Sequence, residues 1–544
     1  MSLARPAEAA PRLWIHLIGP MQAMDGTGTS LLPRSRKARA VLAILALSAP
    51  RPVSRVRITS LLWSQREREQ ARGSLRQCVH EIQGLFQALG PGIIDADREQ
   101  LRLVEDSFWL DVRDAGSDGA GVLLEDLIGL DPAFDEWIRE GQTRKTSKSP
   151  SSNEERGPRV GVRQLRALGG HDETVLAEGL SEELAAALSK FRWIPCVTLG
   201  GPGQGVTETD FEYLLGGAVR RIGDQIRVTL RLQDMRSAAE VIWAKNFDGA
   251  PDDLLAFLDR IVEQTAAQVD PELMLREGAR AAEQVVRDGI VPASVLVLAS
   301  IPAIYRLERN GFEAAGHMLE EAVRIAPDNA MAHAWFAHWQ VMAVGQGWEP
   351  DEAAAIVRAG VSAERAIMLD PSDARALTIA GHVRGFLDKQ AEEALLLHDR
   401  ALARNPALAW AWMMSGLAHC YRGDHQEAIR RIEIARQLSP FDPHAFFFDA
   451  SLTLPHLMLG NLDRALELGR LTVQLKPSFS SSWKFLLVAL GYLGRIDEAR
   501  EARARLQALE PGFSVSEAVR RSPLARPEDL RRFAEGLRLG GLEE

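Results

Sequence analysis

The side chains best suited to chemistry in this 544-residue sequence are basic, and they gather near its beginning. Residues 34–76 hold eleven Lys and Arg but only two acidic residues, Glu67 and Glu69, whereas the whole chain has a formal charge of −10. Guanidinium groups donate paired hydrogen bonds to phosphate and to guanine, so a basic block in an acidic chain is typical of a module that binds a polyanion. A set of solvated, Arg-rich helices is the alternative.

Residues that enzymes use are present, but not at the spacings that catalysis or metal binding requires. The glycine-rich run 200–205 lacks the lysine and the spacing of a phosphate-binding loop. The twelve histidines form no His-Glu-x-x-His pattern, and Cys78, Cys196 and Cys420 lie too far apart in the sequence for a zinc motif. We therefore expect no enzyme, no catalytic residue, no metal site and no cofactor.

Composition also indicates where the protein works. No apolar run approaches the roughly 20 residues that cross a bilayer, and the first residues lack the basic, apolar and cleavage regions of a secretion signal. Three widely separated cysteines fit a reducing compartment. The sequence therefore predicts a cytoplasmic protein without a membrane segment.

Three helices are expected to position the basic residues. A strand over 13–18 comes first, and the helices follow over 36–48, 55–63 and about 66–89. Apolar residues recur at helical spacing along the third helix, which leaves its Arg, Gln and His side chains on the opposite face. A hairpin over 93–104 completes the module.

This order of a small sheet, three helices and a hairpin resembles the winged helix-turn-helix of OmpR/PhoB type, most closely the form that begins SARP activators. The matching segments are Leu17–Pro20, Pro33–Arg39, Arg51–Arg55, Leu61–Trp63, Gln70–Gln77 and Asp95–Leu103. The resemblance implies that residues 1–112 bind duplex DNA, with the third helix in the major groove. It assigns Arg68, Arg72, Ser74, Arg76, Gln77 and His80 to the groove, Arg34, Arg36, Lys37 and Arg39 to the flanking DNA backbone, and Arg98 to the tip of the wing.

Glu81 and Gly84 depart from this pattern near the end of the third helix that is to face DNA. A carboxylate weakens phosphate contacts, and a glycine is expected to fray the helix. This departure leaves open a second interpretation, in which the module contacts only proteins.

The middle of the chain has two parts. Residues 113–157 are expected to form a connector, which over 123–139 looks like the one that precedes a helical activator domain, and a flexible linker by composition over 141–158. Residues 158–275 are predicted to form a small αβ domain from a strand, a helix, three further strands and a closing helix. This domain resembles the TolB-like αβ domain on Glu178–Leu184, Ala187–Trp193 and Leu214–Arg221.

The last part of the chain is repetitive. Prolines at 327, 371, 406, 440, 477 and 511 recur at intervals of 34 to 44 residues, and an alanine stands twelve residues before each. Small residues let two helices approach closely, and proline ends the second helix. The pattern resembles six tetratricopeptide (TPR) repeats over 276–520, followed by a helical tail over 521–544. The resemblance implies an α-solenoid whose groove binds a protein partner or peptide.

The sequence thus predicts a multidomain chain, partly α+β and partly all-α: a winged helix-turn-helix, a small αβ domain and an α-solenoid of TPR repeats. The function it favours is a transcriptional regulator that reads duplex promoter DNA, with the TolB-like and TPR regions binding an effector or a protein partner and a homodimer left open. The alternative is a TPR scaffold or signalling adaptor whose winged helix does not bind DNA.

Overall fold

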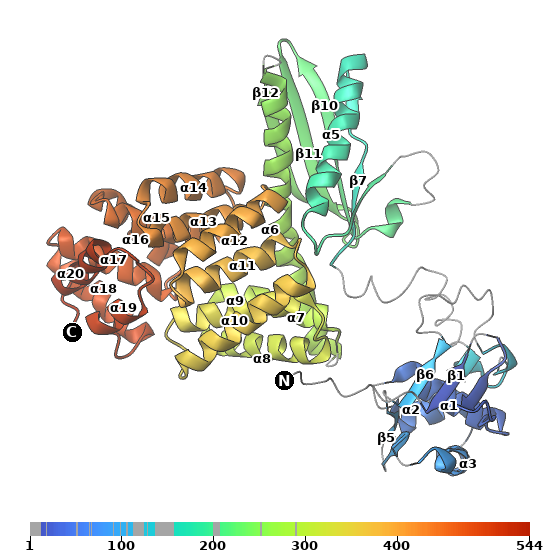
Figure 1. Cartoon of the computed structure of the whole chain (residues 1–544). Helices are drawn as coiled ribbons and strands as arrows, with labels where there is room; N and C mark the ends of the chain where they lie inside the picture. The colour runs from blue at the N-terminus through green and yellow to red at the C-terminus, as the bar shows by residue number, and fades with distance from the viewer. Residues whose placement is uncertain are drawn as a thin grey trace, which may run out of the picture. The chain divides into compact units, whose positions relative to one another are not determined.

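The computed structural model describes most of the chain (Figure 1). The described residues are 12–17, 19–49, 53–64, 66, 68–90, 92–97, 100–104, 107–111, 124–127, 129–135, 157–199, 207–250, 253–288 and 291–544. Most of the predicted linker over 141–158, the glycine-rich run 200–205 and Arg98 lie outside them. The chain divides into two compact units, residues 1–152 and 153–544.

In its described residues, the first unit combines two three-stranded sheets with α-helices and short 3-10 helices. One sheet has the strand order β2-β1-β6, and the other has the order β3-β5-β4. The elements are β1 (Leu13–His16), β2 (Gln22–Asp25), α1 (Arg36–Ser48), β3 (Val53–Ser54), α2 (Arg55–Leu62), α3 (Arg68–Phe86), η1 (Gln87–Leu89), β4 (Ile94–Ala96), β5 (Gln100–Leu103), β6 (Phe108–Leu110) and η4 (Glu125–Leu127). The predicted order of a small sheet, three helices and a hairpin is confirmed.

Local sequence explains where the first two helices begin. Ser35 Oγ accepts a hydrogen bond from the Ala38 N–H at 3.4 Å, and Ser54 Oγ accepts one from the Arg57 N–H at 3.2 Å. A hydroxyl at the N-cap satisfies an amide that the helix leaves free, so both helices start directly after a serine. The faces that α1 and α3 bury include Val41, Ile44, Leu45, Leu75, Val79 and Ile82.

The first unit includes part of the connector. Asp126 Oδ1 accepts a hydrogen bond from the Met21 N–H at 2.8 Å, and Ser64 Oγ donates to Asp131 at 2.6 Å. The unit therefore extends beyond the predicted domain boundary at residue 112. These pairs join residues 105 and 67 positions apart, a distance over which sequence periodicity carries no information.

The second unit begins with an αβ layer. Its six-stranded sheet has the order β12-β11-β10-β7-β9, with β8 beside β10, and α5 and α6 pack beside it (Figure 1). The elements are β7 (Val160–Arg163), β8 (Arg166–Leu168), α5 (His171–Ser189), β9 (Cys196–Leu199), η5 (Glu208–Asp210), β10 (Tyr213–Ile222), β11 (Gln225–Asp234), β12 (Glu240–Gly249) and α6 (Leu254–Asp288). Side chains alternate along β11: Ile226, Val228, Leu230 and Leu232 are buried, and the residues between them are partly or fully exposed.

Helix α6 is longer than the sequence pattern indicates. The helix continues through Pro271 to Asp288 and so crosses the predicted domain boundary at residue 275. Its second half packs against the next helix, α7 (Ala293–Arg306), where Gly278 lies so close that an added Cβ would stand 2.6 Å from Pro302. Packing against the next helix therefore extends α6 beyond the αβ layer.

Over residues 291–544, which are all described, six helix pairs form a TPR-like solenoid. The pairs are α7 (Ala293–Arg306) with α8 (Arg309–Ile325), α9 (Ala330–Gly345) with α10 (Glu352–Leu369), α11 (Ala374–His382) and its π-helical end η7 (Val383–Leu387) with α12 (Ala391–Arg404), α13 (Ala409–Arg422) with α14 (His425–Leu438), α15 (Ala445–Met458) with α16 (Leu462–Leu475), and α17 (Ser480–Tyr492) with α18 (Ile496–Leu509). Two further helices, α19 (Val515–Arg521) and α20 (Pro527–Leu539), follow.

The small residues lie where the repeat pattern predicts. All six of the alanines that precede the prolines by twelve residues are at most 1% exposed: Ala315, Ala359, Ala394, Ala428, Ala465 and Ala499. Gly423, Gly460 and Gly494, which end the first helix of three pairs, have positive φ angles between 67° and 100°. The helix-pair architecture therefore follows from positions that the sequence repeats.

Within the described residues, no single helix has both the length and the hydropathy of a membrane span. Only α6 and α7 taken together, joined at a sharp bend, would meet such a test on length and composition.

Candidate functional site

The exposed face of α3 carries side chains that the winged-helix resemblance assigns to the major groove. Arg72, Arg76, Gln77 and His80 are exposed, and they recur at the three- and four-residue spacings of one helix face. The opposite face packs into the core through Ala71, Leu75, Cys78, Val79 and Ile82. The helix therefore presents two guanidinium groups, an amide and an imidazole on one side.

For three other residues assigned to DNA, the structure describes no exposed side chain. Ser74 is half-buried. Arg68 begins α3, but only its backbone is described, and Arg98 is outside the described residues. The roles of these three side chains stay predictions.

The basic residues of α1 have partners inside the first unit. Arg36 Nη2 donates to the Asp126 carbonyl at 2.8 Å, and Arg39 Nη1 lies 3.2 Å from the Asp126 carboxylate. Lys37 Nζ lies 3.8 Å from the Asp131 carboxylate, and burial lowers the pKa of Lys37. Three of the four side chains expected on the DNA backbone thus hold the connector in place.

Glu81 also has a structural role. Its carboxylate accepts hydrogen bonds from the backbone N–H groups of Arg34 at 2.7 Å and Ser35 at 3.1 Å, while the Arg34 side chain is exposed. Helix α3 continues through Gly84 to Phe86, which is buried. The expectation that Glu81 and Gly84 fray this helix is therefore wrong, and the carboxylate is bound to the start of α1.

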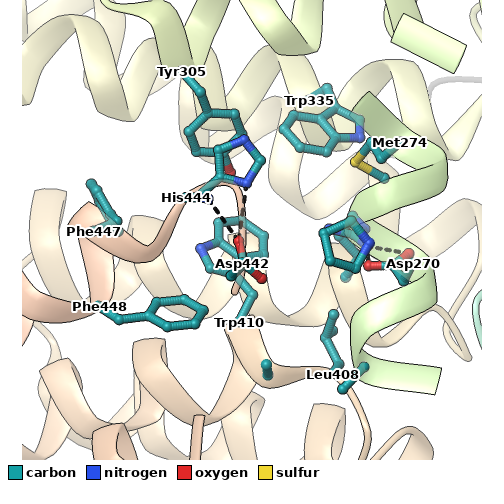
Figure 2. A pocket seen from close by; sticks show the side chains of 14 residues that line it. Asp270, Met274, Tyr305, Trp335, Leu408, Trp410, Asp442, His444, Phe447 and Phe448 are labelled. Atoms are coloured by element: carbon teal, nitrogen blue, oxygen red, sulfur yellow. Dashed lines mark hydrogen bonds and ion pairs between the residues drawn. The ribbon is translucent and has the colours of Figure 1, made fainter. Parts of the chain in front are cut away.

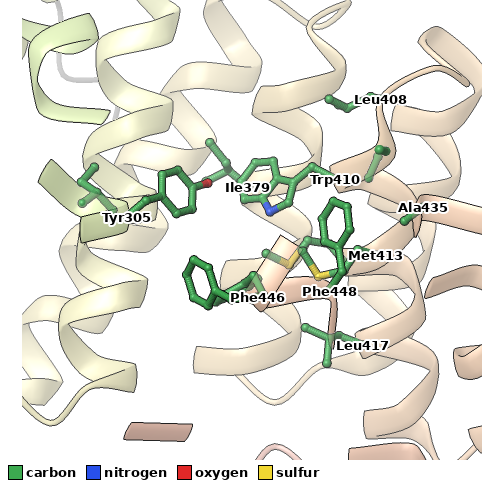
Figure 3. Packing of buried hydrophobic residues seen from close by; sticks show 14 of the residues in the cluster. Tyr305, Ile379, Leu408, Trp410, Met413, Leu417, Ala435, Phe446 and Phe448 are labelled. Atoms are coloured by element: carbon green, nitrogen blue, oxygen red, sulfur yellow. The ribbon is translucent and has the colours of Figure 1, made fainter. Parts of the chain in front are cut away.

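The inner face of the solenoid is formed by the first helix of each pair, α7, α9, α11, α13, α15 and α17. Contacts between early and late pairs fill it. The ring centres of Tyr305 and His444 are 3.7 Å apart, and Gln346 Oε1 accepts a hydrogen bond from Ser480 Oγ at 3.0 Å across 134 positions of sequence. Figure 3 shows Tyr305 directed toward Trp410 in this packed interior.

Helix α6 lies against one end of these inner helices. The Asp270 carboxylate is 2.7 Å from Arg375 Nη2 and accepts a hydrogen bond from Trp193 Nε1 at 2.8 Å. Gln268 Nε2 donates to the Leu438 carbonyl at 3.0 Å. A buried ion pair is stable only where further hydrogen bonds satisfy its groups, and Trp193 supplies one here. These contacts fix α6 to the start of α11 and the end of α14.

A small cavity remains between α6 and the inner face (Figure 2). Tyr305, Trp335, Trp410 and His444 surround it, and Asp442 lies 3.4 Å from His444 Nδ1. The cavity volume is about 30 Å³, which is room for roughly two water molecules. The space is too small for a peptide.

The C-terminal segment, residues 510–540, lies against the other ends of the inner helices. His425 Nε2 is 2.9 Å from the Asp529 carboxylate, and Arg532 Nε donates to the Leu457 carbonyl at 2.8 Å. The predicted tail is therefore helical but packed. With α6 at one end and this segment at the other, parts of the inner face are covered by the chain itself.

An apolar groove lies instead on the outside of the solenoid, between α10 and α12, and is called the outer groove. It has a cavity volume of about 340 Å³, and its apolar lining includes Gly360, Ala363, Ile367, Ala380, Val383 and Leu397. On the same two helices Val357, Val361 and Leu396 are 66%, 63% and 67% exposed. Clustered large apolar side chains in contact with water mark an interaction surface.

The two arginines of the outer groove differ in their acidic neighbours. Arg384 lies between acidic groups, 2.9 Å from Asp388 and 3.9 Å from Glu393, and it also pairs with Glu364. Arg400 is exposed at the groove. A ligand with an acidic group near its apolar face complements this arrangement.

Across the part of the chain that the structure describes, no group of three or more His, Cys, Asp or Glu side chains is arranged to hold a metal ion.

No protein-family model and no curated protein matches this chain. Solved structures with a similar fold include PilW, a type IV pilus biogenesis factor (17% identity, TM-score 0.30, 41% of this chain and 94% of that chain). TTC0263, a thermophilic TPR protein of Thermus thermophilus, has 17% identity and a TM-score of 0.27 over 37% of this chain and 91% of that chain. YrrB, a TPR protein with an unusual peptide-binding site, has 18% identity and a TM-score of 0.22 over 39% and 96%. These are likenesses of fold alone.

Proposed function

We propose that this chain is a cytoplasmic, non-enzymatic adaptor whose solenoid binds a partner protein through the outer groove. The observation that carries the proposal is the apolar groove between α10 and α12, with the exposed side chains Val357, Val361 and Leu396 on its two helices. On the inner face, where a peptide was expected, parts of the surface pack against other segments of the chain.

The occupant that fits this groove is an amphipathic helix. Two parallel walls made of helices accept a third helix, and Gly360 and Ala363 let its backbone approach closely. Such a helix would place apolar residues at i, i+4 and i+7 against Val361, Ile367 and Leu396. An acidic residue beside that stripe would meet Arg400.

Cross-linking from the groove tests this proposal. A photoreactive phenylalanine analogue replaces Leu396 in the full chain, and the cross-linked protein is identified and purified. Its affinity is then measured for the wild type and for Leu396→Glu, which places a charge against the apolar stripe. Leu475→Glu is the matched control, because Leu475 is an exposed leucine on α16, outside the groove.

We expect Leu396→Glu to weaken binding at least about tenfold and Leu475→Glu to leave it unchanged. Equal affinities for the two variants would contradict the outer groove as the binding site. A cross-link to a second copy of this chain would show self-association in place of partner binding.

A second function, binding of duplex DNA by the first unit, is favoured by the exposed polar face of α3. The unit resembles a winged helix-turn-helix, and Arg72, Arg76, Gln77 and His80 have the donor chemistry that reads base edges. Glu81 keeps its negative charge near this face, although its carboxylate accepts hydrogen bonds from the backbone of Arg34 and Ser35. With both functions, the chain would be a transcriptional regulator.

A gel shift with the full chain and genomic fragments tests DNA binding. We expect affinity to fall steeply between about 50 and 200 mM salt, because each neutralised phosphate releases counterions. A folded chain that shows no salt-sensitive binding would leave the adaptor as the only function. The exposed face of α3 would then be a solvated surface.

A further inference from the structure

The six-stranded sheet of the second unit presents one of its faces to solvent, and this is called the open face. Helices α5 and α6 pack on the other face, where the buried side chains include Tyr213, Leu215, Val219, Val228 and Leu230. Because side chains alternate along a strand, Gly216, Ala218 and Arg220 of β10 lie on the open face. Arg220 is exposed there, as are Arg231 of β11 and Ala244 of β12.

The described strands place five arginines on the open face: Arg163, Arg166, Arg220, Arg227 and Arg231. Two of them have acidic partners, since Arg163 Nε lies 2.6 Å from Glu208 and Arg227 Nε lies 2.6 Å from Asp248. Within the residues that the structure describes, the side chains of Arg166, Arg220 and Arg231 are exposed and have no hydrogen bond or ion pair. The open face is therefore basic, on a chain whose formal charge is −10.

The cations of the open face repel one another. Arg220 lies directly opposite Arg227 on the neighbouring strand, and like charges in that position are destabilising. Asp248 is hydrogen-bonded to Arg227, which lowers the pKa of this carboxyl most, whereas Arg220 acts on it only through space. A partner that brings further negative charge would relieve this repulsion.

The three unpaired arginines surround Ala218 at regular steps. Ala218 is paired with Arg166 of β8, and Gly216, two residues earlier on β10, is paired with Arg231 of β11. Arg220 stands two residues after Ala218. Residues on the same face of a strand are about 7 Å apart when they are two positions apart. Measured along β10, the three arginines therefore follow one another at intervals of about 7 Å.

We propose that the open face binds an acidic α-helix of a partner protein, which lies along β10 over Gly216 and Ala218. Carboxylates at i, i+4 and i+8 of such a helix are about 6 Å apart along its axis, close to the spacing of the arginines. Gly216 and Ala218 have no side chain beyond Cβ, so the helix approaches the sheet between the arginines. Leu168, which is paired with Arg220 and is 52% exposed, adds an apolar contact. The open face is distinct from the outer groove and from α3, so this proposal does not depend on either function proposed above.

A helix suits the open face better than an extended peptide or a single-stranded nucleic acid. The N–H and C=O groups of a sheet bond between its strands, so its face offers no partners to an extended backbone, whereas a helix satisfies its own. Single-stranded nucleic acids are held largely by stacking on aromatic rings. The described residues around Ala218 on the open face are aliphatic, polar or basic: Gly216, Arg220, Thr229, Arg231, Ala244 and Asn246.

Fluorescence anisotropy of a labelled helical peptide with the full chain tests the proposal. The probe is an alanine-rich peptide with Glu at every fourth position, and the control peptide carries Gln at the same positions. We expect the Glu peptide to bind, with an affinity that falls as added salt screens the charges. The Gln peptide should bind at least about tenfold more weakly.

A double variant of the chain, Arg220→Gln with Arg231→Gln, should weaken binding of the Glu peptide at least about tenfold. It is expected to fold, because both side chains are exposed, and loss of Arg220 relieves the repulsion from Arg227, so the melting temperature should not fall. Arg324→Gln with Arg430→Gln is the matched control, since it removes two exposed arginines from the solenoid. This control should leave binding unchanged.

A photoreactive residue in the probe locates the bound peptide. Cross-links identified by mass spectrometry should map to the open face of β8, β10 or β11. Cross-links to α3 or to the outer groove in place of these strands would overturn the proposal, as would equal binding of the two peptides or unchanged binding by the folded double variant. Displacement of the Glu peptide by an equal concentration of oligothymidylate would show a general polyanion surface and would also contradict a helix site. If the double variant does not fold, the two peptides and the cross-links decide.

Discussion

Two helix faces of this chain carry side chains that suit a partner. The fold leaves one of these faces exposed and buries the other. On α3, Arg72, Arg76 and Gln77 stay exposed. On the inner face of the solenoid, Tyr305 and Trp410 are buried by α6 and by later helix pairs. The two faces differ in whether another segment of the same chain covers them. A helix face is available to a partner only where the folded chain offers no segment that fits it.

The same contrast separates α1 from α3 within the first unit. Both helices carry arginines, but Arg36 and Arg39 contact Asp126 of the connector, whereas Arg76 extends from the exposed face of α3. Basic composition alone does not distinguish a cation that holds the fold together from one that is presented to a ligand.

The largest effect is expected from breaking the contact that covers the inner face. Asp270→Ala leaves Arg375 buried without its counter-ion, and removing one partner of a buried ion pair typically costs about 3–5 kcal/mol. Urea unfolding followed by tryptophan fluorescence measures the free energy of unfolding. Arg287→Ala is the control, because its ion pair with Asp288 is exposed. A loss below about 1 kcal/mol would show that the pair does not hold α6 on the solenoid.

Overpacking of the repeats should lower the free energy of unfolding by an intermediate amount. Ala428 is fully buried between helices, so Ala428→Leu is expected to cost about 1–3 kcal/mol and to loosen the array locally. The exposed Ala403 of α12 gives the control Ala403→Leu. Thermal unfolding, a gel shift and a promoter reporter on the same variant separate the units. Loss of DNA binding together with regulation would mean that the solenoid holds the first unit in place.

The comparison of α1 with α3 can be tested by two alanine substitutions. Lys37→Ala removes the contact with Asp131 and a cation–π contact with Trp63, and should cost about 1 kcal/mol in stability of the first unit. Arg76→Ala should change stability by less than about 0.5 kcal/mol but cost about 1–3 kcal/mol of affinity at a preferred DNA site. If Lys37→Ala lowered DNA affinity and Arg76→Ala lowered stability instead, α1 and not α3 would be the candidate DNA-reading helix.

The smallest effect concerns the pH dependence of stability. Lys484 has a pKa near 8 in the folded chain against an ordinary value of 10.5, so the unfolded chain binds more protons between these values. The free energy of unfolding should therefore gain a contribution that rises from about pH 8 to pH 10.5. Lys484→Met should lack that rise, and identical slopes for the two proteins would contradict it.

The sequence by itself determined the local elements, because their signals are periodic and short. Six alanines at a constant distance before proline predicted the helix pairs, and all six are buried. Serine is a preferred N-cap residue, and the hydroxyls of Ser35 and Ser54 each accept a hydrogen bond from the backbone three residues later, where α1 and α2 begin. Apolar residues alternate along β11, and these are the side chains that face the core. Each of these inferences depends on neighbours within one turn or one repeat.

The tertiary structure alone decided which surfaces are covered and which charges are paired. Glu81 binds the backbone of Arg34 across 47 positions, and Asp270 pairs with Arg375 across 105. No periodicity in the sequence identifies the cations that Asp126 and Asp131 meet. Such contacts form only when segments far apart in the sequence pack together. Which segments meet depends on the whole fold. For that reason the sequence predicted a solenoid with a groove, and only the structure shows which parts of the inner face other segments of the chain cover.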